Sequence, residues 1–439
     1  MFEQLNSNVV QAVSRIKSLG YSAFIAGATV RDLVMNETPA AYVIITDAEP
    51  ARIKVLFKRT IENRDRKKAI TVIENKTVFD VYCYENKTNG IENSDDILKK
   101  VLTNFDFTMN ALLYNIEDGL IDYFDALSDI ENKTIKLMES SQLFAAQKPV
   151  RMLKAVRYCA QLGFSLDERT ENDIKRYAVF IKRTPSERIR EELDKILMSD
   201  NPGVFMDLNR LGLLKHIIPE LDVCFDVPQK NKYHIYNVGE HIICAVMNTP
   251  NDPALRWAAL LHDIGKPLCR SEDSSGIIHF YGHHRESVRL AADILRQFKT
   301  EPELAKEILI LVENHDVRIE ATPQGVKKMM MRTGADTFAK LLLLQEADNK
   351  AKNMKYFPDK MNKINDVRRI YQKVVAERHP YRISDLALNG RDLNKLGFRP
   401  GHEIWDTLQM LLNEVLLDPS LNTREYLIVR AKQYKRKRV

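Results

Sequence analysis

The sequence predicts an α/β domain at the N-terminus followed by a mostly α-helical remainder. Up to about residue 138, helical patterns alternate with short runs rich in β-branched and aromatic residues, which is typical of strands around a small sheet. Beyond about residue 140 the apolar residues recur at helical spacing and strand signals become rare. With 439 residues the chain is too long for one hydrophobic core, so several domains are expected.

The elements can be assigned in chain order from these patterns. The predicted strands cover residues 22–27, 41–46, 69–74, 77–85 and 120–124. Residues 143–164 carry apolar side chains on one helical face and Arg and Lys on the other, with Gly163 as a C-cap. Residues 186–199 form a second amphipathic helix with Ser186 as its N-cap. Turn-rich stretches at 219–233 and 352–360 predict domain boundaries.

Composition narrows the class of protein. An apolar content of 44% with 29% charged residues is ordinary for a soluble globular chain. No apolar run approaches the ~20 residues of a membrane helix, and the N-terminal residues lack the layout of a signal peptide. The five cysteines are scattered and odd in number, so we expect a reducing, cytoplasmic location with no membrane partner.

Basic residues are clustered although the net charge is only +6. Such clusters suit a polyanion such as RNA, but a solvated basic face is the alternative that charge alone leaves open. The densest cluster ends the chain as "RAKQYKRKRV". The candidate RNA-binding residues there are Lys432, Lys435, Arg436, Lys437 and Arg438.

Histidines and aspartates after residue 240 form the strongest chemical signal. They lie in "VGEHIICAV", "LLHDIGKPL", "HFYGHHRESV", "LVENHDV" and "LLLQEADNKAKN", each within or beside an apolar helical run. Imidazole and carboxylate together suit Mn, Fe, Co, Ni or Zn, and a bound metal makes hydroxide available near neutral pH. Lys266, one turn after His262 and Asp263, is placed to meet a phosphate oxygen.

The order of these motifs resembles the HD superfamily of metal-dependent phosphohydrolases. The resemblance implies that His241, His262, Asp263 and Asp348 hold one divalent metal (Mn, Ni, Co, Fe, Zn or Mg). His283 and His315 would hold a second ion or contact the scissile phosphate. The implied catalytic residues are His262, Asp263, Lys266 and His283.

The wider chain resembles class II tRNA nucleotidyltransferases, the CCA-adding enzymes related to bacterial poly(A) polymerase. The resemblance is carried by "FIAGATVRDLVM", "DFTMNALLYN", "GLIDYFDALSDI", "PVRMLKAVRYCAQLGF", "SERIREELDKILMS" and a tail starting at "ISDLALNGRDL". It implies a nucleotidyltransferase-like head at 1–138, a helical neck at 139–225, an HD domain at 226–352 and a helical, tRNA-binding-like tail at 353–439. The nucleotide-binding remnant would be Gly27, Arg31, Asp32, Asp80, Arg151 and Arg157.

This chain departs from the family at the residues that carry the transferase chemistry. The family's D-x-D pair aligns with Ala41 and Val43, which leaves Asp80 as a single acid where two magnesium ions would need several. The family's arginine at the end of the next strand aligns with Glu85. Its Arg-Arg-Asp aligns with Asn104, Phe105 and Asp106, and its base-selecting Glu-Asp with Gln147 and Lys148.

Three functions remain open on this basis. The favoured one is a lost transferase site with an HD domain that hydrolyses phosphate esters, as a phosphatase or 2′,3′-cyclic phosphodiesterase on RNA or tRNA 3′ ends or nucleotides. The second is a non-enzymatic module that binds RNA or another partner, and the third is a CCA-adding enzyme that is still active. The expected partners are tRNA or other RNA, with a nucleotide as substrate or effector.

Overall fold

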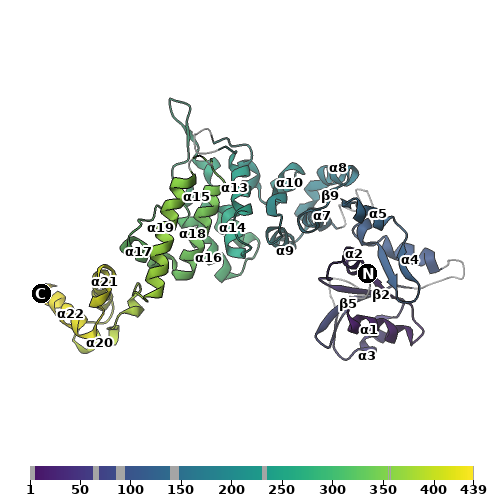
Figure 1. The fold of residues 1–439 in the computed structure, drawn as a ribbon, viewed down its shortest axis with the longest axis horizontal. Coiled ribbons are helices and arrows are strands. Elements are labelled where there is room, and N and C mark those ends of the chain that lie inside the picture. Colours follow the sequence, from purple (N-terminus) through teal and green to yellow (C-terminus); the bar gives the residue numbers. More distant parts are fainter. Residues whose placement is uncertain are drawn as a thin grey trace. The chain divides into compact units, whose positions relative to one another are not determined.

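The computed structural model describes residues 5–62, 69–85, 94–138, 148–229, 235–353, 355 and 357–438. They form two compact units, one reaching to Thr184 and including Leu211–Leu213, the other made of Pro185–Arg210 and the chain from Leu214 onward. The first unit is α/β and the second is helical apart from a short hairpin among its described residues (Figure 1). The predicted fold class, an α/β head followed by mostly helical segments, is confirmed.

The head is built on a seven-stranded sheet with the strand order β3-β4-β5-β2-β1-β6-β7. β2 and β5 are parallel, and the other neighbours are antiparallel. The sequence predicted five of these strands and missed β3 and β6. The bounds are β1 Ala23–Ala26, β2 Tyr42–Thr46, β3 Thr60–Glu62, β4 Ala69–Glu74, β5 Thr77–Cys83, β6 Leu112–Asn115 and β7 Gly119–Asp122.

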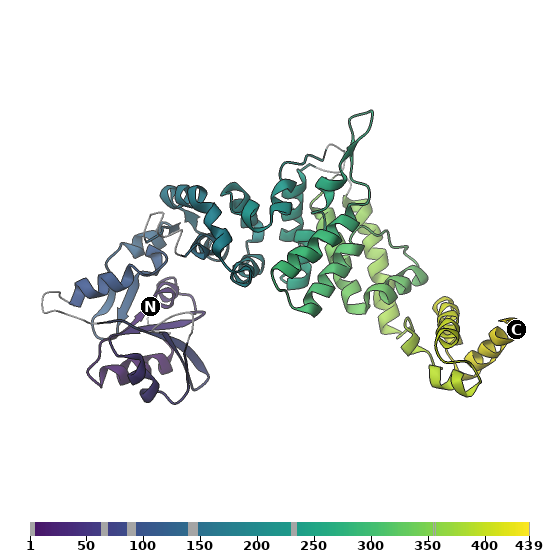
Figure 2. The ribbon, with the colours of Figure 1, turned by 180° about the vertical axis from the view of Figure 1, so that it is seen from behind.

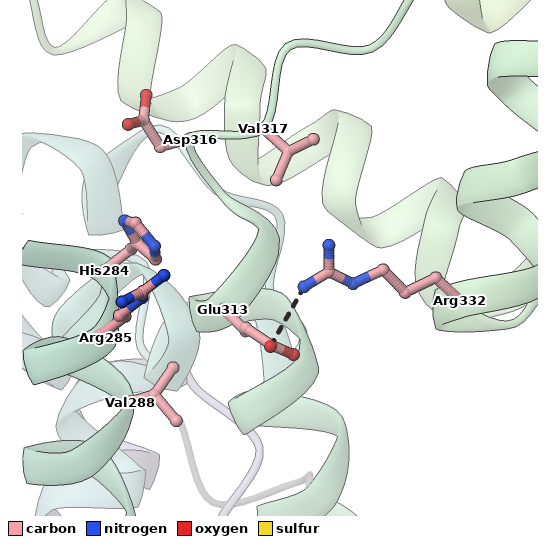
Figure 3. Close-up of a pocket in the computed structure, with 7 residues that line it drawn as sticks. All are labelled: His284, Arg285, Val288, Glu313, Asp316, Val317 and Arg332. Atoms are coloured by element: carbon pink, nitrogen blue, oxygen red, sulfur yellow. Dashed lines mark ion pairs between the residues drawn. The ribbon is translucent and has the colours of Figure 1, made fainter. Parts of the chain in front are cut away.

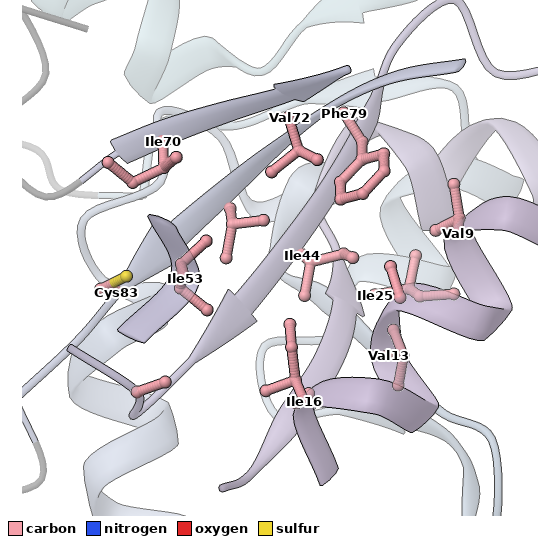
Figure 4. Packing of buried hydrophobic residues seen from close by; sticks show 14 of the residues in the cluster. Val9, Val13, Ile16, Ile25, Ile44, Ile53, Ile70, Val72, Phe79 and Cys83 are labelled. Carbon is pink, nitrogen blue, oxygen red and sulfur yellow. The ribbon is translucent and has the colours of Figure 1, made fainter. Parts of the chain in front are cut away.

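The two faces of this sheet are covered by different helices. Alternate strand residues such as Ile25 and Ile44 pack against α1 (Ser7–Lys17) and α3 (Pro50–Leu56) in one apolar cluster (Figure 4). The residues between them face a second cluster that contains Ile45 and the helix α4 (Ser94–Leu102). Because side chains alternate along a strand, the face that Val43 and Ile45 share is the one on which the family's carboxylates would lie.

Short elements complete the first unit. Gly163 ends α7 in the left-handed conformation, with φ at 67°, so its prediction as a C-cap is confirmed. The remaining bounds are α2 Ala28–Val34, η2 Thr108–Asn110, α5 Ala126–Glu131, β8 Thr134–Ile135, α7 Val150–Leu162, β9 Ser165–Leu166, α8 Glu168–Tyr177 and η3 Ala178–Arg183.

The second unit begins with the short helices of the neck. The helix α9 has Pro185 as its N-cap, so the prediction of Ser186 in that role was wrong by one residue. Proline suits the position because it lacks the N–H that the start of a helix leaves without a partner. The elements are α9 Ser186–Leu197, η4 Pro202–Val204, α10 Phe205–Arg210, α11 Leu214–Ile217 and α12 Pro219–Cys224.

Six longer helices follow, and three of them have a side-chain cap at their start. Asn237 and Glu240 form a capping box at the start of α13, and Asp252 and Thr322 cap α14 and α17. The hairpin of β10 and β11 extends from this bundle (Figures 1 and 2). The bounds are α13 Val238–Met247, α14 Pro253–Leu261, η5 Lys266–Cys269, β10 Ser271–Glu272, β11 Ile278–His279, α15 His283–Gln297, α16 Pro302–Asn314, α17 Pro323–Thr333 and α18 Ala335–Lys350.

The tail has its own apolar cluster, made by α20, α21 and α22. Nowhere in the described part of the chain is a helix long and apolar enough to cross a membrane. The tail elements are α19 Phe357–Ala376, η7 Ile383–Asp385, α20 Gly390–Lys395, α21 His402–Leu417, η8 Pro419–Leu421 and α22 Arg424–Arg438.

Candidate functional site

Four helix ends and one helix interior bring the predicted metal ligands together in the second unit. Each ligand comes from a helix whose apolar face packs in the bundle, so the polar side chains are carried into a buried centre. The ligands are His241 inside α13, His262 and Asp263 directly after α14, His283 at the start of α15, His315 directly after α16 and Asp348 in the last turns of α18.

Four of these residues form a first group of donors. Asp263 Oδ2 lies 3.2 Å from Nε2 of both His241 and His262. Asp348 Oδ1 lies 3.0 Å from His241 Nε2 and 3.7 Å from His262 Nε2. Donors that share one ion at about 2.1 Å lie about 3 Å apart at right angles, so this spacing fits a single cation.

A second group uses the other oxygen of the same aspartate. Asp263 Oδ1 lies 3.2 Å from His283 Nε2 and 3.6 Å from His315 Nε2. The two imidazole Nε2 atoms are 3.3 Å apart. The Asp263 carboxylate therefore belongs to both groups, which can hold a metal ion each.

The imidazole rings are held in the tautomer that metal binding requires. The Nδ1 atom of each ring lies within hydrogen-bond distance of a main-chain carbonyl oxygen, at 2.7–3.2 Å. An Nδ1–H that donates there leaves the Nε2 lone pair free to bind a metal, and it fixes the ring orientation. The carbonyl acceptors are Ala351 for His241, Ala259 for His262, Phe280 for His283 and Val312 for His315.

Burial and charge at the centre also fit a cation. His262 Nε2 and Asp348 Oδ1 are buried and make no hydrogen bond among the described residues, a costly arrangement unless another group binds them. Burial lowers the pKa of His262, but the carboxylates of Asp263 and Asp348 outweigh it and raise that pKa to about 9. Burial raises the pKa of Asp263, while the charges of His262 and Lys266 bring it well below its usual range. The centre is therefore rich in negative charge and favours a positive ion.

Lys266 is buried beside the first group. Its Nζ lies 2.6 Å from Asp263 Oδ2 and donates to Gln229 Oε1 at 2.7 Å. The Phe280 ring lies 5.4 Å from the same Nζ. The ammonium group thus lies at the centre, where its contacts orient Asp263. The expected contact between Lys266 and a phosphate oxygen stays a prediction. No sequence pattern pointed to Gln229, because its contact with Lys266 joins residues that are far apart in the chain.

Lys352 is a second cation at the centre that the sequence analysis missed. It forms an ion pair with Asp348 Oδ2, while Asp348 Oδ1 faces the histidines. Burial alone would lower the pKa of Lys352, but the nearby charge of Asp348 has the larger effect, so that the pKa is raised. The sequence did contain a signal for this ion pair, because Asp348 and Lys352 are four residues apart, the spacing at which side chains on a helix meet.

A cavity of about 500 Å³ lies next to the second group. Figure 3 shows His284 and Arg285 on one side and Arg332 on the other, where Arg332 Nη2 lies 3.1 Å from Glu313 Oε1. His284 and Asp316 each directly follow a donor in the sequence. The lining residues are His284, Arg285, Val288, Glu313, Asp316, Val317 and Arg332.

In the head, Ala41 and Val43, which the resemblance aligns with the family's D-x-D pair, lie just before and within β2. Val43 in β2 is the partner of Asp80 in the parallel strand β5, so both lie on the face covered by α4. Ala41 comes just before β2, and Thr29 Oγ1 donates to its carbonyl oxygen. Asp80 Oδ1 accepts a hydrogen bond of 2.6 Å from Thr71. One carboxylate thus stands where a two-metal site needs several.

The glycine turn of the head is covered by an aromatic ring. Gly27 has φ at 74°, a conformation that favours glycine, and precedes α2. A Cβ atom at Gly27 would lie 2.9 Å from Phe105 Cε1. Phe105, which the resemblance aligns with an arginine of the family, thus places an apolar ring against this turn.

The remnant arginines are engaged inside the head. Arg31 is buried and donates to Asp32 Oδ1 and to Asn110 Oδ1 at 2.8 Å. Arg151 donates to the Asn104 carbonyl oxygen at 3.0 Å.

Asp106 and Arg157 complete this set of contacts. Asp106 pairs with Arg151 and accepts from Lys154 at 2.7 Å. Arg157 donates to Gln161 and lies over the Tyr158 ring. Glu85 follows β5 and is exposed, and Gln147 lies outside the described residues.

The predicted RNA-binding residues all fall in α22. Lys432 and Arg436 are exposed one turn apart. Lys435 instead donates to the Gly397 carbonyl oxygen and lies 5.0 Å from the Phe398 ring. The side chains of Lys437 and Arg438 lie outside the described residues.

Family comparisons match three consecutive parts of the chain. Residues 23–136 match the poly A polymerase head domain, 163–225 the probable RNA and SrmB-binding site of polymerase A, and 232–353 the HD domain. Each of these parts matches its domain model, and the relatives and solved structures described next are CCA-adding or A-adding tRNA nucleotidyltransferases. The family resemblance predicted from the sequence is confirmed.

Individual relatives agree with this assignment. The chain is 29% identical over 197 residues to the CCA-adding enzyme of Lactiplantibacillus plantarum and 31% over 258 residues to the A-adding tRNA nucleotidyltransferase of Deinococcus radiodurans. These alignments cover 43% and 56% of this chain and 48% and 58% of the relatives, so the chain matches about half their length.

Solved structures extend the likeness in fold to the whole chain. The CCA-adding enzyme of Bacillus stearothermophilus in complex with CTP has a TM-score of 0.71 at 20% identity, covering 100% of this chain and 99% of that one. The Thermotoga maritima CCA-adding enzyme complexed with tRNA has a TM-score of 0.58 at 16% identity, covering 98% and 97%.

The first prediction concerns the shared carboxylate. We expect Asp263→Asn to weaken Mn²⁺ binding at both groups, and His283→Gln to weaken it at the second group alone. Each loss should exceed tenfold, because even partners of metal ligands are worth 10- to 100-fold in affinity. The metal content of both variants is measured by mass spectrometry after equilibrium dialysis. His284→Gln is the matched control, since His284 belongs to neither donor group. Unchanged metal content in Asp263→Asn would contradict the assignment.

The second prediction concerns pH and the head. Burial raises the pKa of Asp106, but the charges of Lys154 and Arg151 outweigh it and lower that pKa below 3.8. A carboxyl group with a lowered folded-state pKa stabilises the fold above its unfolded-state pKa, and this stability is lost as pH falls through the folded-state value.

Stability of the head should therefore fall as pH drops below about 4, and Asp106→Asn should remove this part of the pH dependence. At neutral pH the variant should lose about 2 kcal/mol in urea unfolding, because Arg151 loses its partner. Glu117→Gln is the control, since Glu117 is 72% exposed in its pair with Lys17. A pH profile in Asp106→Asn equal to that of the wild type would refute the assignment.

Proposed function

We propose that this chain is a metal-dependent phosphohydrolase that acts through its HD domain, and that its head no longer transfers nucleotides. The observation that carries the proposal is the double use of Asp263, whose two oxygens each face a separate pair of imidazole Nε2 atoms. Binding RNA does not require such an arrangement, whereas hydrolysis of a phosphate ester at a two-ion centre does.

The residues of the chain have distinct roles in this reaction. Divalent ions held by the two groups would supply a Lewis acid and an activated water molecule. Lys266 and Gln229 fix the Asp263 carboxylate, and Lys352 fixes that of Asp348. The side chain of His283 is 13% exposed, whereas that of His241 is fully buried. Substrate would therefore enter on the side of His283.

The loss of transferase activity is supported by the contacts in the head. Two-metal phosphoryl transfer needs a cluster of carboxylates, and Ala41 and Val43 provide none beside Asp80. Phe105 contacts the glycine turn, and Arg31 is committed to Asp32 and Asn110. A triphosphate would find neither its metals nor its cations there.

The proposed substrate is a phosphate ester of a nucleotide, either free or at an RNA or tRNA 3′ end. Support comes from the match to the poly(A) polymerase RNA-binding region and from the exposed Lys432 and Arg436 on α22. Cations on a helix face suit the phosphate backbone of RNA.

A second function is active nucleotide addition, as in the relatives named CCA-adding and A-adding enzymes. The specific observation in its favour is the likeness in fold along the whole chain to a CCA-adding enzyme in complex with CTP. Weighing against it are the contacts of Phe105 and Arg31. A non-enzymatic RNA- or partner-binding role is the third candidate.

The third prediction separates these functions. Full-length protein loaded with Mn²⁺, Ni²⁺, Co²⁺ or Mg²⁺ would be given 2′,3′-cyclic nucleotides, nucleotide monophosphates and tRNA ending in a 3′ or cyclic phosphate. The same protein would be given tRNA lacking its 3′ end with CTP and ATP. We expect metal-dependent hydrolysis that Asp263→Ala abolishes, and no nucleotide addition.

Each other outcome has a defined meaning. Nucleotide addition would show that the head has ligands other than those described and would overturn the loss of transferase activity. Absence of both reactions, with RNA binding retained, would replace the enzyme by the binding module.

A further inference from the structure

We infer that Tyr281 is the stacking surface for an unpaired nucleobase of the substrate. This inference rests on the proposed function and deepens it, because it makes the HD centre selective for nucleotides rather than for phosphate esters in general. It joins three observations, namely the exposure of the Tyr281 ring, its rigid support and its connection to a candidate metal ligand.

The Tyr281 side chain is unusually open to solvent. It is 77% exposed, compared with 58% for Trp405 and 37% for Tyr236. An aromatic ring that the fold leaves open offers a flat surface to a base, and stacking is a main source of affinity in proteins that bind single-stranded nucleic acid.

The ring is nevertheless held in place on its other face. It stacks on the imidazole of His279, with centroids 5.2 Å apart and planes 9° apart. His279 Nε2 lies 2.8 Å from Asp273 Oδ2, and Asp273 Oδ1 accepts from the backbone N–H of Ile277 at 3.0 Å. The hairpin of β10 and β11 thus supports the ring, so a base that stacks on it meets a preorganised surface.

The same segment is tied to the catalytic centre. His283 Nδ1 lies 2.8 Å from the carbonyl oxygen of Phe280, the residue before Tyr281, and the Phe280 ring lies 5.4 Å from Lys266 Nζ. Gly282 has φ at 78° and turns the chain into α15. Two residues span at most about 7 Å, so the Cα atoms of Tyr281 and the candidate ligand His283 lie within the length of one nucleotide.

The surroundings favour a nucleotide at this place. Arg285 is exposed in the first turn of α15, four residues after Tyr281 in the sequence, and its charge suits the phosphate of an RNA chain. The nearby cavity is less suited to a base, because charged groups dominate its lining and Glu313 pairs with Arg332 (Figure 3). The base is therefore assigned to Tyr281 and not to the cavity.

The fourth prediction compares a nucleotide with its baseless analogue. With metal-loaded full-length protein, we expect Tyr281→Ala to lower kcat/KM for adenosine 2′,3′-cyclic phosphate about tenfold, the size of one base–aromatic stack. Ribose 2′,3′-cyclic phosphate without a base should be hydrolysed at the wild-type rate. Tyr281→Phe, which keeps the ring, should leave both reactions unchanged.

Leu268→Ala is the matched control, because Leu268 is 61% exposed near Lys266 and has no ring. An equal loss on both substrates in Tyr281→Ala would mean that the ring serves the structure, and it would overturn the inference. Unchanged hydrolysis of the nucleotide would overturn it as well and would assign the exposed ring to another partner.

A binding measurement separates this inference from the proposed function. If the wild type hydrolyses neither substrate, the proposed function fails. Fluorescence anisotropy with a labelled oligoadenylate then decides the inference alone. Weaker binding by at least fivefold in Tyr281→Ala, with Tyr281→Phe unchanged, supports a nucleobase at this ring. Equal affinity of all variants refutes it.

Discussion

The carboxylate of Asp263 is the constraint around which the HD domain is organised. One oxygen faces His241 and His262, and the other faces His283 and His315. A carboxylate fully buried among four imidazole rings is expensive in an apolar core unless cations compensate for it. Lys266 supplies one such charge, and the donor geometry suits metal ions for the rest. The surrounding helices are positioned so that their ends meet this one residue.

The packing of the head is compatible with the proposed loss of transferase activity. Its sheet is held by two apolar clusters, and Val43 and Phe105, which the resemblance aligns with polar residues of the family, pack against the second of them. If carboxylates stood at positions 41 and 43 in an ancestor, Ala41 and Val43 would remove their mutual repulsion, and Phe105 adds apolar contact beside Gly27. The substitutions that we propose abolish transfer are therefore neutral or favourable for packing, which explains why the sheet persists around them.

The sequence predicted a large part of this arrangement. A strand with alternating burial, such as β5, and the helices that carry the donors follow from local periodicity. The strands β3 and β6 were missed although β1 and β7 are as short as β6 and were predicted. The pairing of β3 and β6 is decided by neighbours across the sheet and not by a local pattern.

The donor residues could also be chosen from the sequence, because His and Asp recur inside apolar helices. The sequence could not predict that Asp263 belongs to both donor groups, because that depends on which carboxylate oxygen faces which helix. The sequence also did not predict the role of Gln229 or the stacking of His279 on Tyr281, because both depend on tertiary structure. Conversely, Arg31 and Lys435 were expected to meet nucleic acid or nucleotide, and the fold gives both of them internal partners.

The central claim is that metal ions bind in the HD domain and not at the strand edge of the head. The most direct measurement is anomalous diffraction at the manganese edge from crystals grown with Mn²⁺ and CTP. We predict anomalous peaks between Asp263 and its two pairs of histidines, and none beside Asp80. A peak beside Asp80, with CTP over the turn at Gly27, would contradict the claim and would restore the head as the catalytic domain.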